Sequence, residues 1–211
     1  VDIAAFSLPL LAFGIPLLFS GKSSRKSVGE FIFGFSFLFM GLQALKANAP
    51  DLGANPEMLA FVQNYTDMGF LSIILFLFIG AILTMIVQAS AATMAITLIM
   101  CANGWIDYHL GVALVLGENI GTTITANLAA LTGNTQSRRA ALAHLVFNIF
   151  GVMWVLVLFY PFTAAVSWFV TDVMNISDPA VAVSFKLAAF HTAFNISNTF
   201  IMIWFVGLIE K

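Results

Sequence analysis

Long apolar runs, separated by short polar stretches, are the feature that most restricts how this chain can fold. Hydrophobic residues make up 61% of the 211 residues and charged residues only 9%, whereas soluble domains carry about a quarter of charged residues. The runs therefore predict an all-α, polytopic protein that lies in a lipid bilayer. The single cysteine, Cys101, excludes an internal disulfide bond and is interpreted as a packing residue.

The order of the apolar runs predicts the order of the helices. The first run, residues 3–19, contains Pro9 and Pro16, which should kink it. No basic region of a signal peptide precedes this run, so Val1 is expected to be an internal start in a processed or longer chain. Residues 47–67 are polar and are predicted to form a loop that could include a short helix. Further crossings are predicted at residues 29–46, 110–132, 138–160 and 180–208, with an additional apolar segment at 162–174.

Residues 68–104 are predicted to form a re-entrant hairpin. Residues 68–87 could cross a membrane on length alone, but too few apolar residues for a second crossing remain between Gln88 and Asn103, because a span needs about 20. The turn is expected at residues 88–93. Non-helical backbone at membrane depth must be satisfied by protein or trapped water, so this turn should line a cavity.

Basic residues predict the orientation of the chain. If residues 68–104 return to the side from which they enter, the basic loops 20–28 and 133–139 share one face of the membrane. The positive-inside rule places that face in the cytoplasm, below a plasma membrane that in bacteria is the inner membrane. Two complete crossings by residues 68–104 would place the basic loops on the same face, so this orientation does not distinguish the hairpin from two crossings. The pair Arg138-Arg139 is interpreted as a cytoplasmic anchor, and no nucleic-acid partner is expected.

Glu118 lies inside the uncharged apolar stretch that contains Leu-Gly-Glu-Asn-Ile-Gly-Thr-Thr-Ile-Thr, whereas the other carboxylates fall in or beside predicted loops and ends. A carboxylate at membrane depth is costly and is functional by default. Glycines and hydroxyl side chains surround it, so residues 117–123 are predicted to unwind the helix and to bind an ion or anion. Two alternatives remain: a glycine packing motif, or a protonated Glu118 that only hydrogen-bonds a neighbour.

Residues 88–93 read Gln-Ala-Ser-Ala-Ala-Thr between two apolar runs. At a hairpin tip, the free N–H groups that begin the following half-helix would attract an anion. The alternative is a helix-packing patch of small residues, although the amide of Gln88 would need partners there.

Two segments share the pattern His-x-x-Phe-Asn, in which His144 and Asn148, like His191 and Asn195, lie four residues apart on one helix face. Interhelical hydrogen bonds are favoured over ligand roles for these side chains.

Together these motifs resemble the type II sodium–phosphate cotransporter family. Its Gln-Ser-Ser-Ser-Ala-Thr, Gly-Ala-Asn-Ile-Gly-Thr-Thr and Arg-Ala-Ala-x-Ala-His-x-x-Phe-Asn segments are matched here in order by residues 88–93, 117–123 and 139–148, with a closing match at 190–195. The resemblance covers roughly residues 28–208. This sequence departs from the family at Ala89 and Ala91, which replace serines, and at Glu118, which replaces a small residue.

The resemblance implies a fold of two inverted repeats whose hairpin tips meet near the membrane midplane. Residues 1–27 would be the last helix of a preceding repeat with its basic loop, and residues 28–211 would be the second repeat. The implied phosphate ligands are Gln88, Ser90, Thr93, Asn119, Thr122 and Thr123. The expected sodium ligands are Gln88, Ser90, Glu118, Asn119, Thr122 and Thr125.

The implied function is sodium-coupled import of inorganic phosphate, with Na⁺ as coupling ion and no cofactor. Transport of another oxyanion, or coupling to protons, is an alternative; a non-transporting membrane scaffold or regulatory subunit is another. No enzyme is expected, because Ser/His/Asp spacing, a metal-ligand cluster and a phosphate-binding Gly-Lys loop are all absent from the sequence. One hairpin would supply half a site, so these residues alone should not transport. Their expected partner is a preceding homologous repeat, with a homodimer as the alternative.

Overall fold

The chain is seen in a computed structural model that describes residues 6–48, 60 and 64–209. Its contacts divide the chain into two compact units, residues 1–50 and 51–211. Throughout the described residues, helices alternate with turns and no strand occurs. Three helical stretches are long and apolar enough to cross a membrane, namely Ser23–Ala44, Phe70–Val87 and Thr135–Val157. The all-α, polytopic class is therefore confirmed.

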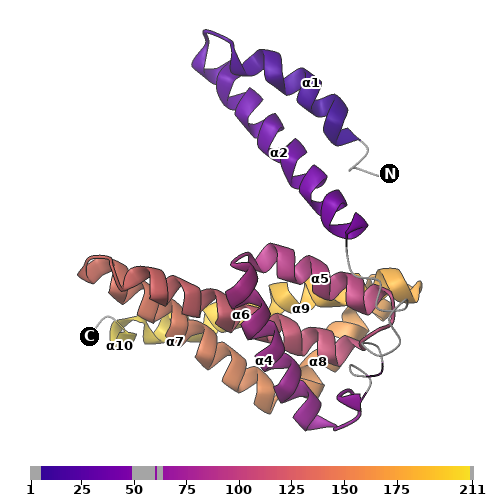
Figure 1. The fold of residues 1–211 in the computed structure, drawn as a ribbon. Helices are drawn as coiled ribbons and strands as arrows, with labels where there is room; N and C mark the ends of the chain where they lie inside the picture. Colours follow the sequence, from indigo (N-terminus) through magenta and orange to yellow (C-terminus); the bar gives the residue numbers. More distant parts are fainter. Residues whose placement is uncertain (1–5, 49–59, 61–63, 210–211) are drawn as a thin grey trace. The chain divides into compact units, whose positions relative to one another are not determined.

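The smaller unit is a helical hairpin of α1 (Ser7–Leu18) and α2 (Ser23–Ala47), which lie side by side in Figure 1. A Cβ atom built on Gly29 would lie 2.8 Å from the backbone nitrogen of Leu18. The glycine therefore allows the two helices to approach at backbone distance.

Helix α2 begins at Ser23 and not at residue 29 as expected, so Arg25 and Lys26 belong to its first turn instead of a loop. The two compact units divide after residue 50, which groups α2 with α1. The assignment of residues 1–27 and 28–211 to two repeats stays a prediction. The loop expected at residues 47–67 lies mostly outside the described residues.

The larger unit consists of consecutive helices joined by short turns (Figure 1). In chain order they are α4 (Phe70–Val87), α5 (Ser90–Ala102), α6 (Tyr108–Ala130), α7 (Thr135–Val157), α8 (Phe159–Trp168), the π-helix η3 (Phe169–Val173), α9 (Pro179–Met202), the 3₁₀ helix η4 (Ile203–Phe205) and α10 (Val206–Ile209). The crossings predicted around residues 138–160 and 180–208 correspond to α7 and α9. The additional apolar segment at 162–174 is the end of α8 with η3.

Three of these helices begin at a side-chain cap. Each cap accepts a hydrogen bond from a backbone N–H two or three residues later: Asp107 from Leu110, Asn134 from Ser137, and Asp178 from Ala180 and Val181. An N-cap oxygen satisfies a backbone donor that the helix itself leaves free. The Asn134 cap starts α7 at Thr135, so most of the segment expected to be the loop 133–139 is helical.

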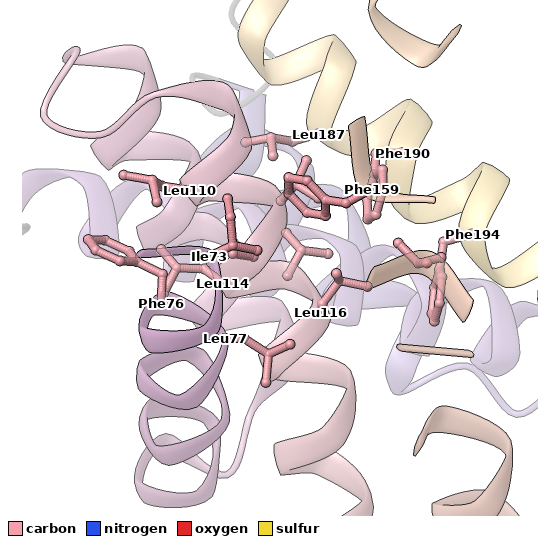
Figure 2. Close-up of a cluster of buried hydrophobic side chains, with 14 of the residues drawn as sticks. Ile73, Phe76, Leu77, Leu110, Leu114, Leu116, Phe159, Leu187, Phe190 and Phe194 are labelled. Atoms are coloured by element: carbon pink, nitrogen blue, oxygen red, sulfur yellow. The ribbon is translucent and has the colours of Figure 1, made fainter. Parts of the chain in front are cut away.

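Helix α6 is the centre of the larger unit, and it contacts α4, α5, α7 and α9. Each side chain from Leu110 to Leu116 is buried. Figure 2 shows Leu110, Leu114 and Leu116 among apolar side chains from the neighbouring helices. The labelled neighbours are Ile73, Phe76 and Leu77 of α4, Phe159 of α8, and Leu187, Phe190 and Phe194 of α9.

The unwound helix predicted at residues 117–123 is wrong: α6 is one unbroken α-helix from Tyr108 to Ala130. Its glycines serve packing instead. A Cβ atom on Gly117 would lie 1.9 Å from the carbonyl oxygen of Leu77, and one on Gly121 would lie 2.5 Å from that of Ala81. These glycines let α4 and α6 touch at their backbones.

Candidate functional site

The turn expected at the hairpin tip is present between α4 and α5. Gln88 ends α4 in the left-handed conformation, with φ of 56°, and its N–H donates to the Thr84 carbonyl at 2.8 Å. Ala89 is extended, and α5 begins at Ser90 without a side-chain cap. The side chains of Gln88 and Ser90 are exposed, and in the described part of the chain neither makes a hydrogen bond. They are free to bind a ligand. Both helices pack on α6.

Glu118 is buried in the middle of α6, with 3% of its surface exposed. Its Oε1 accepts a hydrogen bond of 2.7 Å from the hydroxyl of Thr97 on α5, whose side chain is also buried. Among the described residues, this is the one hydrogen bond that the Glu118 carboxyl makes. One donor is little for a buried carboxylate, which has about four acceptor positions.

Two further polar atoms on α4 and α6 are buried without a partner among the residues that the structure describes. They are the hydroxyl oxygen of Thr84, near the end of α4, and the amide nitrogen of Asn119, which follows Glu118 in α6. A buried donor or acceptor that lacks a partner costs about 1–3 kcal/mol. Such groups are therefore candidates for contact with a bound ligand.

The threonines of α6 are satisfied within the helix. Thr122, Thr123 and Thr125 donate to carbonyl oxygens of Glu118, Ile120 and Thr122, three or four residues earlier, at 2.7–2.9 Å. Thr93 of α5 is fully buried and donates to the Ala89 carbonyl at 3.3 Å. These hydroxyls are occupied as donors but keep lone pairs on their oxygens. In this arrangement they suit a cation better than an anion.

The His-x-x-Phe-Asn pairs do not form the interhelical hydrogen bonds that were expected. The amide nitrogens of Asn148 and Asn195 donate to the carbonyls of His144 and His191, four residues earlier on their own helices, at 3.0 and 2.8 Å. The pattern therefore marks a bond within one helix turn, and the histidine contributes its backbone to that bond. His144 itself is exposed, beside a hollow of about 450 Å³ between the end of α6 and the start of α7.

Further interhelical polar contacts come from residues that the sequence did not single out. Asn198 of α9 accepts from Trp154 Nε1 at 3.2 Å and donates to the Phe147 carbonyl at 2.9 Å, so it joins α9 to α7 twice. Asn127 donates to the Ala141 carbonyl at 2.8 Å and joins α6 to α7.

Thr84 and Thr97 were also missed. Their spacing was a usable signal, because each lies four residues from a motif residue, Gln88 and Thr93 respectively.

Within the described residues, no three His, Cys, Asp or Glu side chains gather as metal ligands. A cation bound at this site would rely on Glu118 and on hydroxyl, amide and carbonyl oxygens. Na⁺ is a hard cation of the kind that such oxygens bind.

A family model described as Na+/Pi-cotransporter matches residues 53–210. The chain belongs to the Na⁺/Pi-cotransporter family. Membership confirms the resemblance seen in the motifs, and this family is one of transporters and not of enzymes. No solved structure gives a significant match.

Relatives of this Na⁺/Pi-cotransporter chain occur in bacteria and mammals. "Uncharacterized protein YqeW" of Bacillus subtilis is 29% identical over 96% of the chain and 61% of its own length. "Putative inorganic phosphate export protein YjbB" of Salmonella typhimurium is 27% identical over 100% of the chain and 36% of its own length. "Sodium-dependent phosphate transport protein 2B" of Rattus norvegicus is 41% identical over 44% of the chain and 13% of its own length. The chain thus spans only part of the length of these relatives.

Proposed function

We propose that this chain forms half of the transport core of a sodium-coupled carrier that imports inorganic phosphate across the plasma membrane. The observation that carries the proposal concerns two adjacent residues of α6, one of which lacks positively polarised partners and the other a hydrogen-bond acceptor. Within the described part of the chain, Glu118 is a buried carboxylate with one hydrogen-bond donor, and Asn119 has a buried N–H group with no acceptor. A cation would satisfy the first and an oxyanion the second. Binding of one would favour binding of the other, which is coupling.

The site residues divide between the two substrates according to their free atoms. Gln88, Ser90 and Asn119 have unused donors and would hold phosphate. The hydroxyls of Thr93 and Thr123 would have to break their hydrogen bonds to backbone carbonyls of their own helices before they could donate to phosphate. Sodium would bind the Glu118 carboxylate. The hydroxyl oxygens of Thr122 and Thr125 still have lone pairs and would be further ligands. The side-chain oxygens of Gln88, Ser90 and Asn119 would complete the set.

The proposed architecture places the tip between α4 and α5 inside the membrane, opposite a second tip from a preceding repeat. Helix α5 has 13 residues, about 20 Å of helix, which is shorter than the hydrocarbon core of a bilayer. The segments 20–28 and 133–139 would then face the cytoplasm, in bacteria below the inner membrane. Cysteines at Asp67 and Asp107 should be labelled from the same, extracytoplasmic side. Labelling of the two from opposite sides would exclude the hairpin.

The direct test uses the full-length protein in liposomes with radioactive phosphate. Uptake should follow an inward sodium gradient and should disappear when K⁺ or choline replaces Na⁺. Gln88→Ala should strongly reduce this uptake at equal protein content, because it removes an exposed amide at the tip. Phosphate uptake that does not depend on sodium would overturn the proposal. Uptake driven by a pH gradient alone, or inhibited by sulfate as strongly as by unlabelled phosphate, would indicate the proton-coupled carrier or the carrier of another oxyanion.

Export is the second candidate, and the names of the YjbB relatives favour it. A coupled carrier is reversible, so the gradients of sodium and phosphate set its direction. Liposomes loaded with phosphate and given an outward sodium gradient distinguish the candidates. A strict exporter would release phosphate without sodium outside or inside, whereas the proposed carrier would require sodium on the phosphate-loaded side.

A further inference from the structure

Thr97 and Glu118 form the one side-chain hydrogen bond between α5 and α6 in the described part of the chain. Both side chains are buried, with 1% and 3% of their surfaces exposed. The hydroxyl donates to Oε1, and no other described residue donates to the carboxyl group. Thr97 therefore fixes where the carboxylate lies but does not satisfy it.

Thr84 of α4 places a second polar group with an unsatisfied hydrogen-bonding atom against the same part of α6. Its side chain is 1% exposed, and its hydroxyl has no hydrogen-bond partner among the residues that the structure describes. Unlike Thr93 and Thr122, it does not donate to the carbonyl four residues earlier. A Cβ atom built on Gly121 would lie 2.9 Å from the Thr84 Cβ. The side chain of Thr84 thus packs directly over Gly121.

The unpartnered hydroxyl and the carboxylate lie within one turn of each other along α6. Gly121 follows Glu118 by three residues, so the two positions share a side of the helix and lie about 4.5 Å apart along its axis. A carboxylate oxygen on α6 and a hydroxyl oxygen of α4 therefore lie within one helical turn of each other along this side of α6. These are the oxygen ligands of a small monovalent cation.

We infer that Thr84 and Thr97 complete a sodium site at Glu118, with Thr84 as an oxygen ligand and Thr97 as the positioning residue of the carboxylate. The inference deepens the proposed function and rests on it. Bound sodium would satisfy both the carboxylate and the Thr84 oxygen. A proton on Glu118 would neutralise the charge but leave Thr84 without a partner.

The three helices that border the site, α4, α5 and α6, supply no competing cation. The sequences of α4, α5 and α6 contain no Lys or Arg, and their one histidine, His109, stacks near Phe159 and Tyr160. Helix α9, which packs on α5 and α6, carries Lys186 and His191. The Lys186 ammonium lies 5.8 Å from the centroid of the Tyr108 ring, at the start of α6 and not at Glu118. Helices α4, α5 and α6 therefore offer Glu118 no lysine or arginine, and a cation at its carboxylate would come from outside these helices.

The test compares isosteric variants of the full-length protein in liposomes. Thr84→Val and Thr97→Val remove only the hydroxyl group, whereas Thr84→Ser and Thr97→Ser keep it. The Val variants should raise the sodium concentration for half-maximal phosphate uptake at least tenfold, with the phosphate KM at saturating sodium unchanged within about twofold. The Ser variants should stay within about threefold of wild type. Thr163→Val is the matched control, because Thr163 is equally buried but lies on α8 and bonds to its own helix.

A second measurement, the rise in thermal stability when NaCl replaces KCl in the absence of phosphate, should be present in wild type and lost in both Val variants. Val variants with wild-type sodium dependence in both measurements overturn the inference and leave the proposed function intact. Wild-type protein without any sodium dependence overturns the proposed function itself. If a Val variant does not fold, Thr84→Ala or Thr97→Ala replaces it, and equal sodium dependence of the Ala and Ser variants overturns the inference.

Discussion

The contact between α7 and α9 and the contact between α4, α5 and α6 both contain buried polar side chains, but only the first satisfies them. Asn198 joins α9 to α7 through two hydrogen bonds, and Gly151 provides the room, since a Cβ there would lie 2.6 Å from the Asn198 amide nitrogen. Around α6, by contrast, Glu118 has a single donor, while Thr84 and Asn119 have unpartnered atoms.

The difference separates polar groups that join helices from polar groups that are candidates for binding a ligand. Completed hydrogen bonds in lipid hold helices together, whereas unpartnered groups destabilise the fold unless something binds them. The region around α6 is stabilised in another way, by glycines that bring the backbones of α4 and α6 into contact and by the apolar side chains of Figure 2. The contact between α4 and α6 therefore does not depend on hydrogen bonds between polar side chains.

The largest expected effect is on that backbone contact. Gly117→Ala places a Cβ 1.9 Å from the Leu77 carbonyl, so α4 and α6 must separate, and the free energy of unfolding should fall by about 3 kcal/mol. Gly151→Ala should cost less, because the neighbouring atoms are side-chain atoms of Asn198 and Phe194 that can rotate. Gly34→Ala, which meets nothing within 4 Å, is the control. Denaturation in detergent measures all three, and equal losses for Gly117→Ala and Gly151→Ala would contradict the contrast.

The second prediction concerns a substitution that should change sodium activation and leave thermal stability nearly unchanged. Glu118→Gln keeps the shape of the side chain and its bond with Thr97 but removes the charge, so half-maximal activation should require at least tenfold more sodium, about 1.4 kcal/mol. Phosphate affinity at saturating sodium and thermal stability should change little. Sodium titrations of phosphate uptake measure the effect. Unchanged sodium activation in Glu118→Gln would show that Glu118 is a protonated structural group, like the amides of α7 and α9.

The third prediction is the reverse case, an effect on stability without an effect on sodium dependence. Asn198→Leu removes both bonds to α7 and should lower the free energy of unfolding by about 1 kcal/mol. The folded fraction should keep wild-type sodium activation. Asn195→Leu is the control on the same helix, since Asn195 donates to its own helix and should matter less for the α7–α9 contact. A shift in sodium activation for Asn198→Leu would place Asn198 in the transport site and remove the contrast.

The sequence predicted the helices and the turn at Gln88 well, because apolar runs and short polar breaks are local signals. Its prediction of a broken helix at Gly117 was wrong, because glycines that unwind a helix and glycines that allow close packing produce the same sequence pattern. Only the position of Leu77 and Ala81 across the interface distinguishes the two. Asn198 was missed because a hydrogen bond between helices that are far apart in the sequence leaves no local pattern.

The smallest expected effect is at His144, where the motif suggested an interhelical hydrogen bond. The hydrogen bond within His-x-x-Phe-Asn uses the His144 carbonyl, which any residue supplies, and the imidazole itself is exposed. His144→Ala should therefore change the free energy of unfolding by less than about 0.5 kcal/mol and leave sodium activation unaltered. Asn148→Leu, by contrast, removes the buried amide that makes the bond and should be the more destabilising of the two. Thermal unfolding and sodium titration of both variants check this. If His144→Ala weakened phosphate uptake, the exposed imidazole would be a ligand that the structure leaves unpartnered, and His144 would then belong with Thr84 and Asn119 instead of with Asn198.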